Sequence, residues 1–201
     1  MTGFKLNKNY RKPKQIYNYF PKDKDELNLL ITKLIWERGY QADLNDIDTS
    51  QITDMSYVFQ FSKFNGDISG WDVSNVRRMT YMFYASAFNN NISRWDTSKV
   101  QLMDGMFNCA QFNDDISKWD VSSVENMSYM FAGAKYSGKN GDISKWDVSN
   151  VEIMDYMFAK SKFNGDLSEW DVSSAASKCQ MFCETPLAGK ENVWFNYHFL
   201  N

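Results

Sequence analysis

One tryptophan recurs at an almost constant spacing along most of the chain and begins a W-D-[VT]-S segment each time. The five positions are separated by 24, 24, 27 and 24 residues and are Trp71, Trp95, Trp119, Trp146 and Trp170. A fixed period of this size is typical of a solenoid, in which each repeat buries its apolar side chains only against its neighbours. The spacing predicts a repeat array of about six repeats over residues 47–182. It favours a binding surface over an enzyme.

The segment 64–83, FNGDISGWDVSNVRRMTYMF, represents the repeat and predicts two short elements. Its first part, residues 67–71, follows an Asn-Gly turn signal and is expected to be a short strand. Its second part, residues 74–83, has apolar residues at helical spacing: Val76, Met79, Met82 and Phe83. One short strand and one short helix per repeat predict an α/β repeat solenoid of the leucine-rich-repeat type.

Aligning the repeats places similar residues in columns that are expected to form the core. The apolar columns are Ile52, Val76, Val100, Val124, Val151; Met55, Met79, Met103, Met127, Met154; and Phe59, Phe83, Phe107, Phe131, Phe158, Phe182. An amide column is assigned to Asn65, Asn89, Asn113, Asn140 and Asn164. Stacked amides can bond the loop backbone of their own and adjacent repeats, which satisfies buried polar groups. The three extra residues before Trp146 are expected to bulge out as Ser137-Gly138-Lys139, with Tyr136 in the phenylalanine role.

At these residues the chain resembles a known family. The unit F-N-x-D-I-S-x-W-D-V-S-N-V-x-x-M-x-x-M-F is similar to the repeat of bacterial BspA-like leucine-rich-repeat proteins. The lead-in PKDKDELNLLITKLIWERG is similar to the cap that precedes such arrays, so the resemblance covers residues 21–182. It implies a repeat solenoid that binds proteins, often at a bacterial surface. It implies no particular partner and transfers no catalytic residue.

The segments that flank the repeats are expected to cap the array. Residues 1–22 form a basic and aromatic leader, since residues 1–24 carry a net charge of +6 and the remainder −9. Residues 23–46 contain a helix over 24–38 with one apolar stripe, which is expected to cover the first repeat. Residues 183–201 are rich in aromatic residues and are expected to form the C-terminal cap. The alternatives are a nucleic-acid contact for the leader and partner docking for either cap.

Cysteine usage and the chain start indicate a reducing compartment. The odd count of three cysteines, Cys109, Cys179 and Cys183, argues against a disulfide framework. The first 20 residues show no apolar signal region, and no apolar run is long enough to cross a membrane. We therefore expect a cytoplasmic protein, or a surface-exposed one if an export signal precedes residue 1. Neither a membrane nor a nucleic acid is expected as a partner.

Two kinds of repeated polar position are candidate partner-binding residues. The variable column before the tryptophan contains Arg94, Lys118, Lys145 and Glu169, and the acidic column before it contains Asp67, Asp115, Asp142 and Asp166. Fixed columns build the core of a repeat protein, and variable columns present the surface that a partner recognises. The aspartates have two further interpretations, a calcium site or local bonds to turn amides, and the absence of a D-x-[DN]-x-[DN]-G loop favours the second.

An enzyme or a metal protein is the weaker hypothesis. His198 is the only histidine, and together with Cys179 and Cys183 it is the one constellation that could act as a nucleophile–base pair or ligate zinc. No fourth zinc ligand and no glycine-rich phosphate loop accompany it. We expect a non-catalytic protein-interaction module without a cofactor, monomeric or weakly oligomeric, with an inhibitor, immunity or counter-defence role included. A surface adhesin is the alternative.

Overall fold

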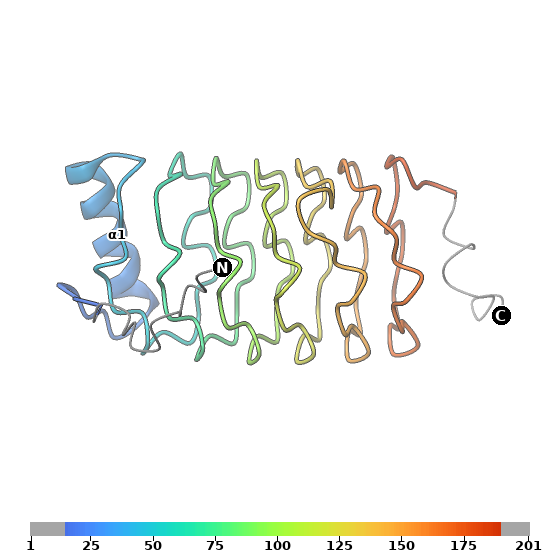
Figure 1. Ribbon diagram of the computed structural model, residues 1–201, viewed down its shortest axis with the longest axis horizontal. Coiled ribbons are helices and arrows are strands. Elements are labelled where there is room, and N and C mark those ends of the chain that lie inside the picture. Colours follow the sequence, from blue (N-terminus) through green and yellow to red (C-terminus); the bar gives the residue numbers. More distant parts are fainter. Residues whose placement is uncertain (1–14, 190–201) are drawn as a thin grey trace, which may run out of the picture.

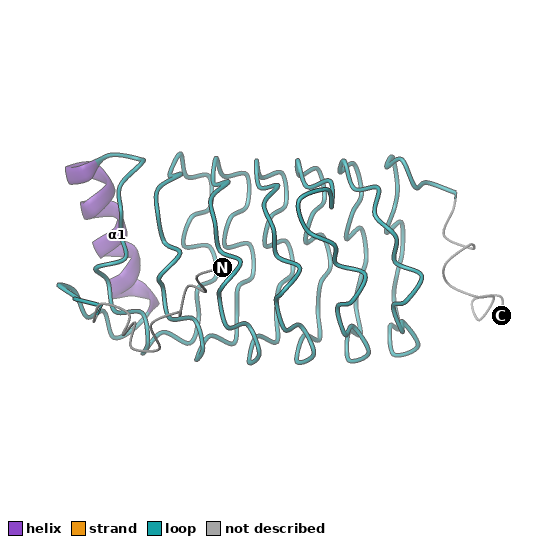
Figure 2. Cartoon of the chain, viewed as in Figure 1, coloured by secondary structure: helices purple, strands orange, loops and turns teal. Residues whose placement is uncertain are grey.

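The computed structural model describes residues 15–189, and every structural statement below concerns this part of the chain. It contains one helix, α1 (Lys24–Arg38), and no strand among the described residues. The remaining chain consists of turns and extended segments. Successive turns lie side by side in an elongated stack, with α1 at the N-terminal end (Figures 1 and 2). No helix within residues 15–189 is long and apolar enough to cross a membrane.

Helix α1 has the bounds that the sequence predicts, and its ends are formed by the residues that flank it. The Asp23 carboxylate accepts hydrogen bonds from the backbone N–H groups of Asp25 and Glu26, which are otherwise unpaired at a helix start. Gly39, with a φ of 87°, ends the helix and donates its N–H to the carbonyl of Ile35. Leu27, Ile31 and Leu34 are buried, so one face of α1 packs against the core.

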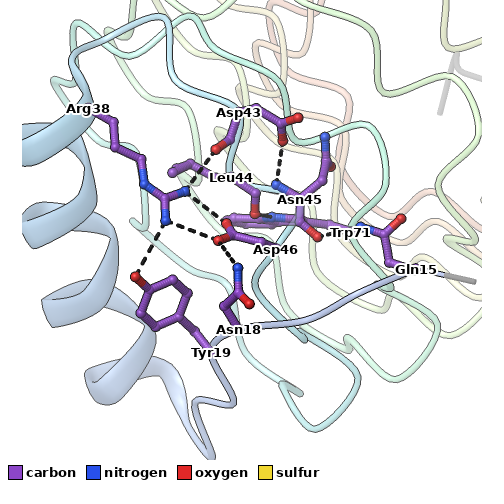
Figure 3. A network of polar contacts seen from close by, with 9 residues as sticks. All are labelled: Gln15, Asn18, Tyr19, Arg38, Asp43, Leu44, Asn45, Asp46 and Trp71. Atoms are coloured by element: carbon purple, nitrogen blue, oxygen red, sulfur yellow. Dashed lines mark hydrogen bonds and ion pairs between the residues drawn. The ribbon is translucent and has the colours of Figure 1, made fainter.

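A polar network joins the C-terminal end of α1 to the first turn (Figure 3). The Arg38 guanidinium donates to both carboxylate oxygens of Asp46, at 2.9 and 3.0 Å, and to the carbonyl of Asp43 at 3.2 Å. The same guanidinium lies 5.6 Å from the Tyr19 ring centroid. The Asn18 side chain donates to Asp46 at 2.9 Å. This network fixes the segment before α1, the helix end and the first turn against one another.

Adjacent turns are joined along one side by a regular hydrogen-bond ladder. We define six ladder segments by the residues that form it: 53–61, 77–85, 101–109, 125–133, 152–160 and 176–184. In the second segment, alternate N–H groups donate to the next turn: Met79 to Leu102, Tyr81 to Asp104, Phe83 to Met106 and Ala85 to Asn108, at 2.8–2.9 Å. The intervening N–H groups of Met82 and Tyr84 donate to carbonyls three residues earlier, at 3.2 and 3.1 Å.

This ladder replaces the short strand and short helix that the sequence predicts in each repeat. Over residues 67–71 only Asp67 forms a bridge, and residues 74–83 contain turns and one bridge residue, Arg78, but no helix. The spacing of Val76, Met79, Met82 and Phe83 fits a helical face, and all four are buried as predicted. Their backbone N–H groups, however, bond the next turn or the residue three positions back, so no helix can form.

Each ladder segment has a left-handed backbone at its fifth and ninth residues. The non-glycine residues with φ between 50° and 67° are Tyr57, Phe61, Tyr81, Ala85, Cys109, Tyr129, Tyr156, Lys160, Gln180 and Glu184. Gly105 and Gly133 occupy the remaining two positions, with φ of 59° and 66°. A left-handed conformation costs a residue with a β-carbon roughly 1–2 kcal/mol. The inter-turn hydrogen bonds and the buried side chains beside these positions must offset that cost.

The core consists of aromatic rings and indoles stacked from turn to turn. Rings of the column Phe59, Phe83, Phe107, Phe131, Phe158 and Phe182 have neighbouring centroids 5.5–5.7 Å apart. Each indole N–H in the tryptophan column donates to a carbonyl of the preceding turn, at 3.0–3.3 Å. The acceptors are Leu44, Ile68, Ile92, Ile116 and Ile143. Each tryptophan therefore contributes to packing and also satisfies a carbonyl of the preceding turn, which a phenylalanine could not do.

The amide column continues through Ser137, and the assignment of Asn140 to it is wrong. The Asn65 and Asn89 side-chain oxygens accept from the backbone N–H one turn later, at 2.8 and 2.7 Å. The Asn113 oxygen accepts from Ser137 at 2.8 Å, so Ser137 stands 24 residues after Asn113 in the column. The three extra residues are therefore 138–140. Asn140 instead donates its side-chain amide to the Asn113 carbonyl.

Tyr136 takes the phenylalanine position, as predicted, but leaves a polar group unsatisfied. Its ring is 1% exposed and stacks between Phe112 and Phe163, with centroids 6.4 and 6.1 Å away. Its hydroxyl has no hydrogen-bond partner among the described residues. Burial raises the pKa of Tyr136, and the nearby Asp115 and Asp142 raise it further.

The C-terminal end of the stack departs from the repeat pattern. Lys178 stands in the methionine column and donates its ammonium group to the carbonyls of Val172 and Ala175. Burial lowers the pKa of this lysine. Leu187, 3% exposed, belongs to the buried core. The rest of the predicted aromatic cap, from residue 190 onward, lies outside the described residues, as does most of the predicted leader.

Substitution of Tyr136 by Phe should stabilise the protein. The change removes the unsatisfied hydroxyl and keeps the ring, so the free energy of unfolding should rise by about 1 kcal/mol. The matched control is Phe112→Tyr, which puts a hydroxyl into the same column one turn earlier and should lower the stability. Urea unfolding measures both. A Tyr136→Phe variant that is less stable than the parent would contradict the assignment of an unsatisfied hydroxyl.

Acidification should remove the stabilisation that Asp46 provides. Hydrogen bonding from Arg38 holds the pKa of Asp46 below its ordinary value, with burial acting in the opposite direction. Because the folded pKa is the lower one, the stabilisation is complete above about pH 4 and is lost as the pH falls through the folded pKa. Asp46→Asn should cost about 1 kcal/mol at neutral pH and much less at pH values around 2.

Urea unfolding at the two pH values tests this difference. Glu37→Gln is the control, since Glu37 pairs with Lys33 at 3.9 Å on the exposed helix surface and should contribute little at either pH. An Asp46→Asn penalty that is the same at both pH values would show that the carboxylate charge is not what stabilises the network.

Candidate functional site

The polar columns predicted to bind a partner are on the surface, but their side chains have different local roles. Arg94, Lys118, Lys145 and Glu169 are all exposed. Lys145 and Glu169 form an ion pair between adjacent turns. Exposed pairs of this kind contribute little to stability. The structure thus brings these four side chains into one exposed column.

The aspartates at the start of each repeat bond the turn that follows them. Asp67, Asp115, Asp142 and Asp166 accept a hydrogen bond from the backbone N–H two residues later, at 2.8–2.9 Å. The second aspartate row makes the same contact in Asp72, Asp96, Asp120, Asp147 and Asp171. Hydrogen bonds from Ser117 lower the pKa of Asp115, and those from Ser98 lower the pKa of Asp96. The aspartates therefore act as turn-stabilising side chains.

Neither the aspartates nor the cysteines form a metal-binding group in the described residues. No cluster of three or more histidine, cysteine, aspartate or glutamate side chains within residues 15–189 could hold a metal ion. The cysteines in this range are free, with Cys109 and Cys179 exposed and Cys183 half-buried. His198, the third residue of the predicted zinc or catalytic group, lies outside the described residues.

A second surface, which the sequence analysis did not single out, carries exposed aromatic side chains on the ladder segments. We call it the aromatic face and define it by Tyr57, Phe61, Tyr81, Tyr84, Tyr129 and Tyr156. Phe61, Tyr57 and Tyr129 are 66%, 48% and 37% exposed, and the other three are half-buried. Monomeric soluble proteins rarely gather large apolar groups on adjacent surface positions without a use for them.

The aromatic face is ordered by contacts between its own rings. Tyr57 stacks on Tyr81 with centroids 5.8 Å apart, and Tyr129 stacks on Tyr156 at 4.9 Å. Tyr84 meets Phe61 edge-on at 4.9 Å. Burial raises the pKa of Tyr81, and the neighbouring Asp104 raises it further, so this hydroxyl stays protonated at neutral pH. The rings are held in position before any partner arrives, which lowers the entropy cost of binding.

Gly105 interrupts the tyrosine row at the third ladder segment. A β-carbon at this position would lie 2.2 Å from a ring atom of Tyr81, so the ring of Tyr81 covers the glycine. The left-handed φ of 59° is also favourable for glycine. Gly105 thereby divides the row into two tyrosine pairs, one in the first two segments and one in the fourth and fifth.

Charge changes sign along the aromatic face. The second ladder segment begins with Arg77 and Arg78, both exposed and without an ion pair to any described residue. The fourth and fifth segments begin with Glu125 and Glu152, which are also exposed. One half of the face is cationic at its edge and the other half anionic.

A hollow of about 350 Å³ lies in the anionic half of the face. Its lining includes Tyr129 and Tyr156, the small residues Ala132, Gly133 and Ala159, and the ion pair between Lys160 and Glu184 at 3.4 Å. A second hollow of about 630 Å³ lies beside α1 and is lined in part by Trp36, Tyr40 and Phe61. Trp36 is 86% exposed there. Phe61 therefore connects the aromatic face to the α1 end of the stack.

The sequence contained one signal for this face. Tyrosine recurs at positions 57, 81, 129 and 156, in the register of the repeat, two residues before the phenylalanine column. These tyrosines belong to none of the core or surface columns that the sequence predicts. The glycine that interrupts the row, and the left-handed backbone that turns these rings outward, have no sequence signature of their own.

Comparison with known proteins gives one match. A family model described as "Mycoplasma protein of unknown function, DUF285" matches residues 33–140 and 109–194. No curated protein and no solved structure matches the chain.

Gly105→Ala should disturb the aromatic face through Tyr81. The new methyl group must displace the Tyr81 ring, so we expect a loss of about 1–3 kcal/mol in the free energy of unfolding. In a Tyr81→Ala background the obstacle is absent, and the same change should cost clearly less. A double-mutant cycle by urea unfolding measures this coupling. Equal costs in the two backgrounds would contradict the contact between the Tyr81 ring and Gly105.

Proposed function

We propose that this chain, which belongs to the family described as a Mycoplasma protein of unknown function, DUF285, is a non-catalytic protein-interaction module. In this proposal it binds a partner protein through the surface of its stacked turns. The observation that carries the proposal is the aromatic face, with its preformed tyrosine pairs and the exposed Phe61. Tyrosine and other aromatic residues are enriched where protein interfaces obtain most of their binding energy.

The fold class belongs to the same proposal. We interpret the stacked turns as a repeat solenoid related to the BspA-like leucine-rich-repeat type. The support is the parallel pairing of residues one repeat apart, such as Asp54 with Arg78 and Arg78 with Leu102. Such arrays present an extended surface whose outer residues vary while the core columns stay constant. An interaction role follows from that design and requires no catalytic group.

The aromatic face is a better candidate than the charged column of Arg94, Lys118, Lys145 and Glu169. Exposed charges mainly affect association rates and partner choice, whereas buried aromatic anchors account for most of the affinity of protein complexes. The charged column contains no exposed aromatic residue and includes one internal ion pair. The aspartate row beside it bonds its own turns. In this proposal the charged column and the aspartate row contribute to solubility and to the electrostatic steering of a partner.

Site-specific photo-crosslinking in the host cell tests this function. A benzophenone amino acid replaces Tyr57 in one variant and Tyr129 in a second, and Lys118 in a control variant from the charged column. We expect a discrete crosslinked protein from the two tyrosine positions and none from position 118. Mass spectrometry of the band identifies the bound chain.

Two outcomes would overturn the proposal in different ways. A discrete product from position 118 alone would move the binding surface to the charged column. No discrete product from any of the three positions would argue against a protein-binding role. An inhibitor, immunity or counter-defence role and a surface-adhesin role both fall within the proposal, and the identity of the crosslinked chain would distinguish them.

A further inference from the structure

We propose that the aromatic face binds a second copy of this chain, with the two stacks antiparallel and related by a twofold axis at the third ladder segment, 101–109. This inference rests on the proposed function, because it names the partner of the same face. The face is complementary to itself in shape, in charge and in aromatic pattern once the order of the turns is reversed. An isologous interface requires this relation, since each contact must occur twice.

Shape complementarity comes from the eighth and ninth residues of the ladder segments. In the first two segments these positions include the large side chains of Phe61 and Tyr84, whose rings pack edge-on. In the fourth and fifth segments they hold Ala132, Gly133, Ala159 and Lys160, which all line the 350 Å³ hollow. Reversing the order of the turns about the third segment places the Phe61–Tyr84 pair of each copy over the hollow of the other.

Charge complementarity follows the same reversal. Arg77 and Arg78 in the second segment then face the fourth segment, which begins with Glu125 and is followed one turn later by Glu152. The same contacts form a second time on the other side of the axis. With the axis along the stack instead, the two copies would be parallel and each ladder segment would face its own equivalent in reverse. Arg77 and Arg78 would then lie opposite the end of the second segment, where no carboxylate meets them. The charges therefore favour the antiparallel arrangement.

The aromatic row reads identically in both directions. From the first to the fifth segment, the fifth residues are Tyr57, Tyr81, Gly105, Tyr129 and Tyr156. Each tyrosine pair of one copy meets the pair at the other end of its partner. Lys160 of one copy then lies over Phe61 of the other, where a cation and an aromatic ring attract each other.

At the centre of the face the Tyr81 ring covers the buried Gly105, and Leu102 in the same segment is a half-buried apolar residue. Asp104, which would meet its equivalent near the axis, already accepts a hydrogen bond from Thr80 at 2.9 Å. Cys109 is exposed at the end of the same segment, so the two Cys109 thiols would be neighbours across the axis.

Charge reversal provides the sharpest test, with mass by sedimentation equilibrium as the readout. The parent chain should have a mass near 47 kDa, which is twice the 23.5 kDa of one chain. The variants Arg77→Glu/Arg78→Glu and Glu125→Lys/Glu152→Lys should each dissociate at least about tenfold more readily. An equimolar mixture of the two variants should recover the parent mass, because both sets of contacts become attractive again. Arg94→Glu/Lys118→Glu is the matched control and should leave the mass unchanged.

Disulfide trapping gives a second, independent readout. Oxidation with copper phenanthroline removes two protons and two electrons from a pair of thiols, and should link two chains through Cys109. Cys109→Ser should abolish the covalent dimer, whereas Cys179→Ser/Cys183→Ser should not. Cysteines form a disulfide only when their α-carbons lie within about 7 Å, so the trap reports the position of the axis.

The outcomes separate this inference from the function on which it rests. A parent mass of 23.5 kDa at about 0.1 mM chain, together with a photo-crosslink from Tyr57 to a different protein, would overturn the second copy and keep the interaction role. A dimer that the charge reversals do not weaken, or that is trapped through Cys179 or Cys183 and not through Cys109, would also overturn it. A monomer that forms no crosslink from the aromatic face would refute both proposals.

Discussion

The hydrogen bonds between one turn and the next determine what every other part of this structure can do. In the first five ladder segments, alternate backbone N–H groups donate to the following turn, and N–H groups between them donate to carbonyls three residues back. This pairing holds equivalent residues of adjacent repeats side by side. The phenylalanine rings can then stack at 5.5–5.7 Å, and each indole can reach the carbonyl of the preceding turn. This backbone path requires left-handed residues at the fifth and ninth positions of each ladder segment. Four of the fifth positions are the tyrosines of the aromatic face.

The sequence predicted the core well because the core depends on repeat spacing. The tryptophan and phenylalanine columns are buried as expected, and α1 has the expected bounds. The local structure within each repeat was not predictable in the same way. Val76, Met79, Met82 and Phe83 have the spacing of a helical face, but they are buried by a different backbone path whose hydrogen bonds run between turns. Side-chain periodicity identifies which residues face inward and leaves the backbone conformation open.

The surface residues of the candidate site show the same limit of prediction from side-chain periodicity. The charged and acidic columns were visible in the sequence, and the structure accounts for the aspartates through turn amides. The aromatic face was not recognised, because its tyrosines occupy left-handed positions where sequence rules anticipate glycine or asparagine. Ser137 was similarly missed in the amide column, since a serine hydroxyl and an asparagine amide look unrelated until their backbone positions are known. Backbone geometry shows which residues share a column and which lie on the surface, and residue type alone does not.

Pairing of the aromatic face with itself about the third ladder segment is tested directly by distances between spin labels. Single labels at Lys63, Gln111 and Lys162, in a chain whose native cysteines are replaced by serine, mark one exposed column beside the first, third and fifth segments. Pulsed electron resonance should give the shortest distance between copies for Gln111 and two longer, similar distances for Lys63 and Lys162. Equal distances at all three positions would indicate parallel copies, and the absence of dipolar coupling at every position would contradict pairing altogether.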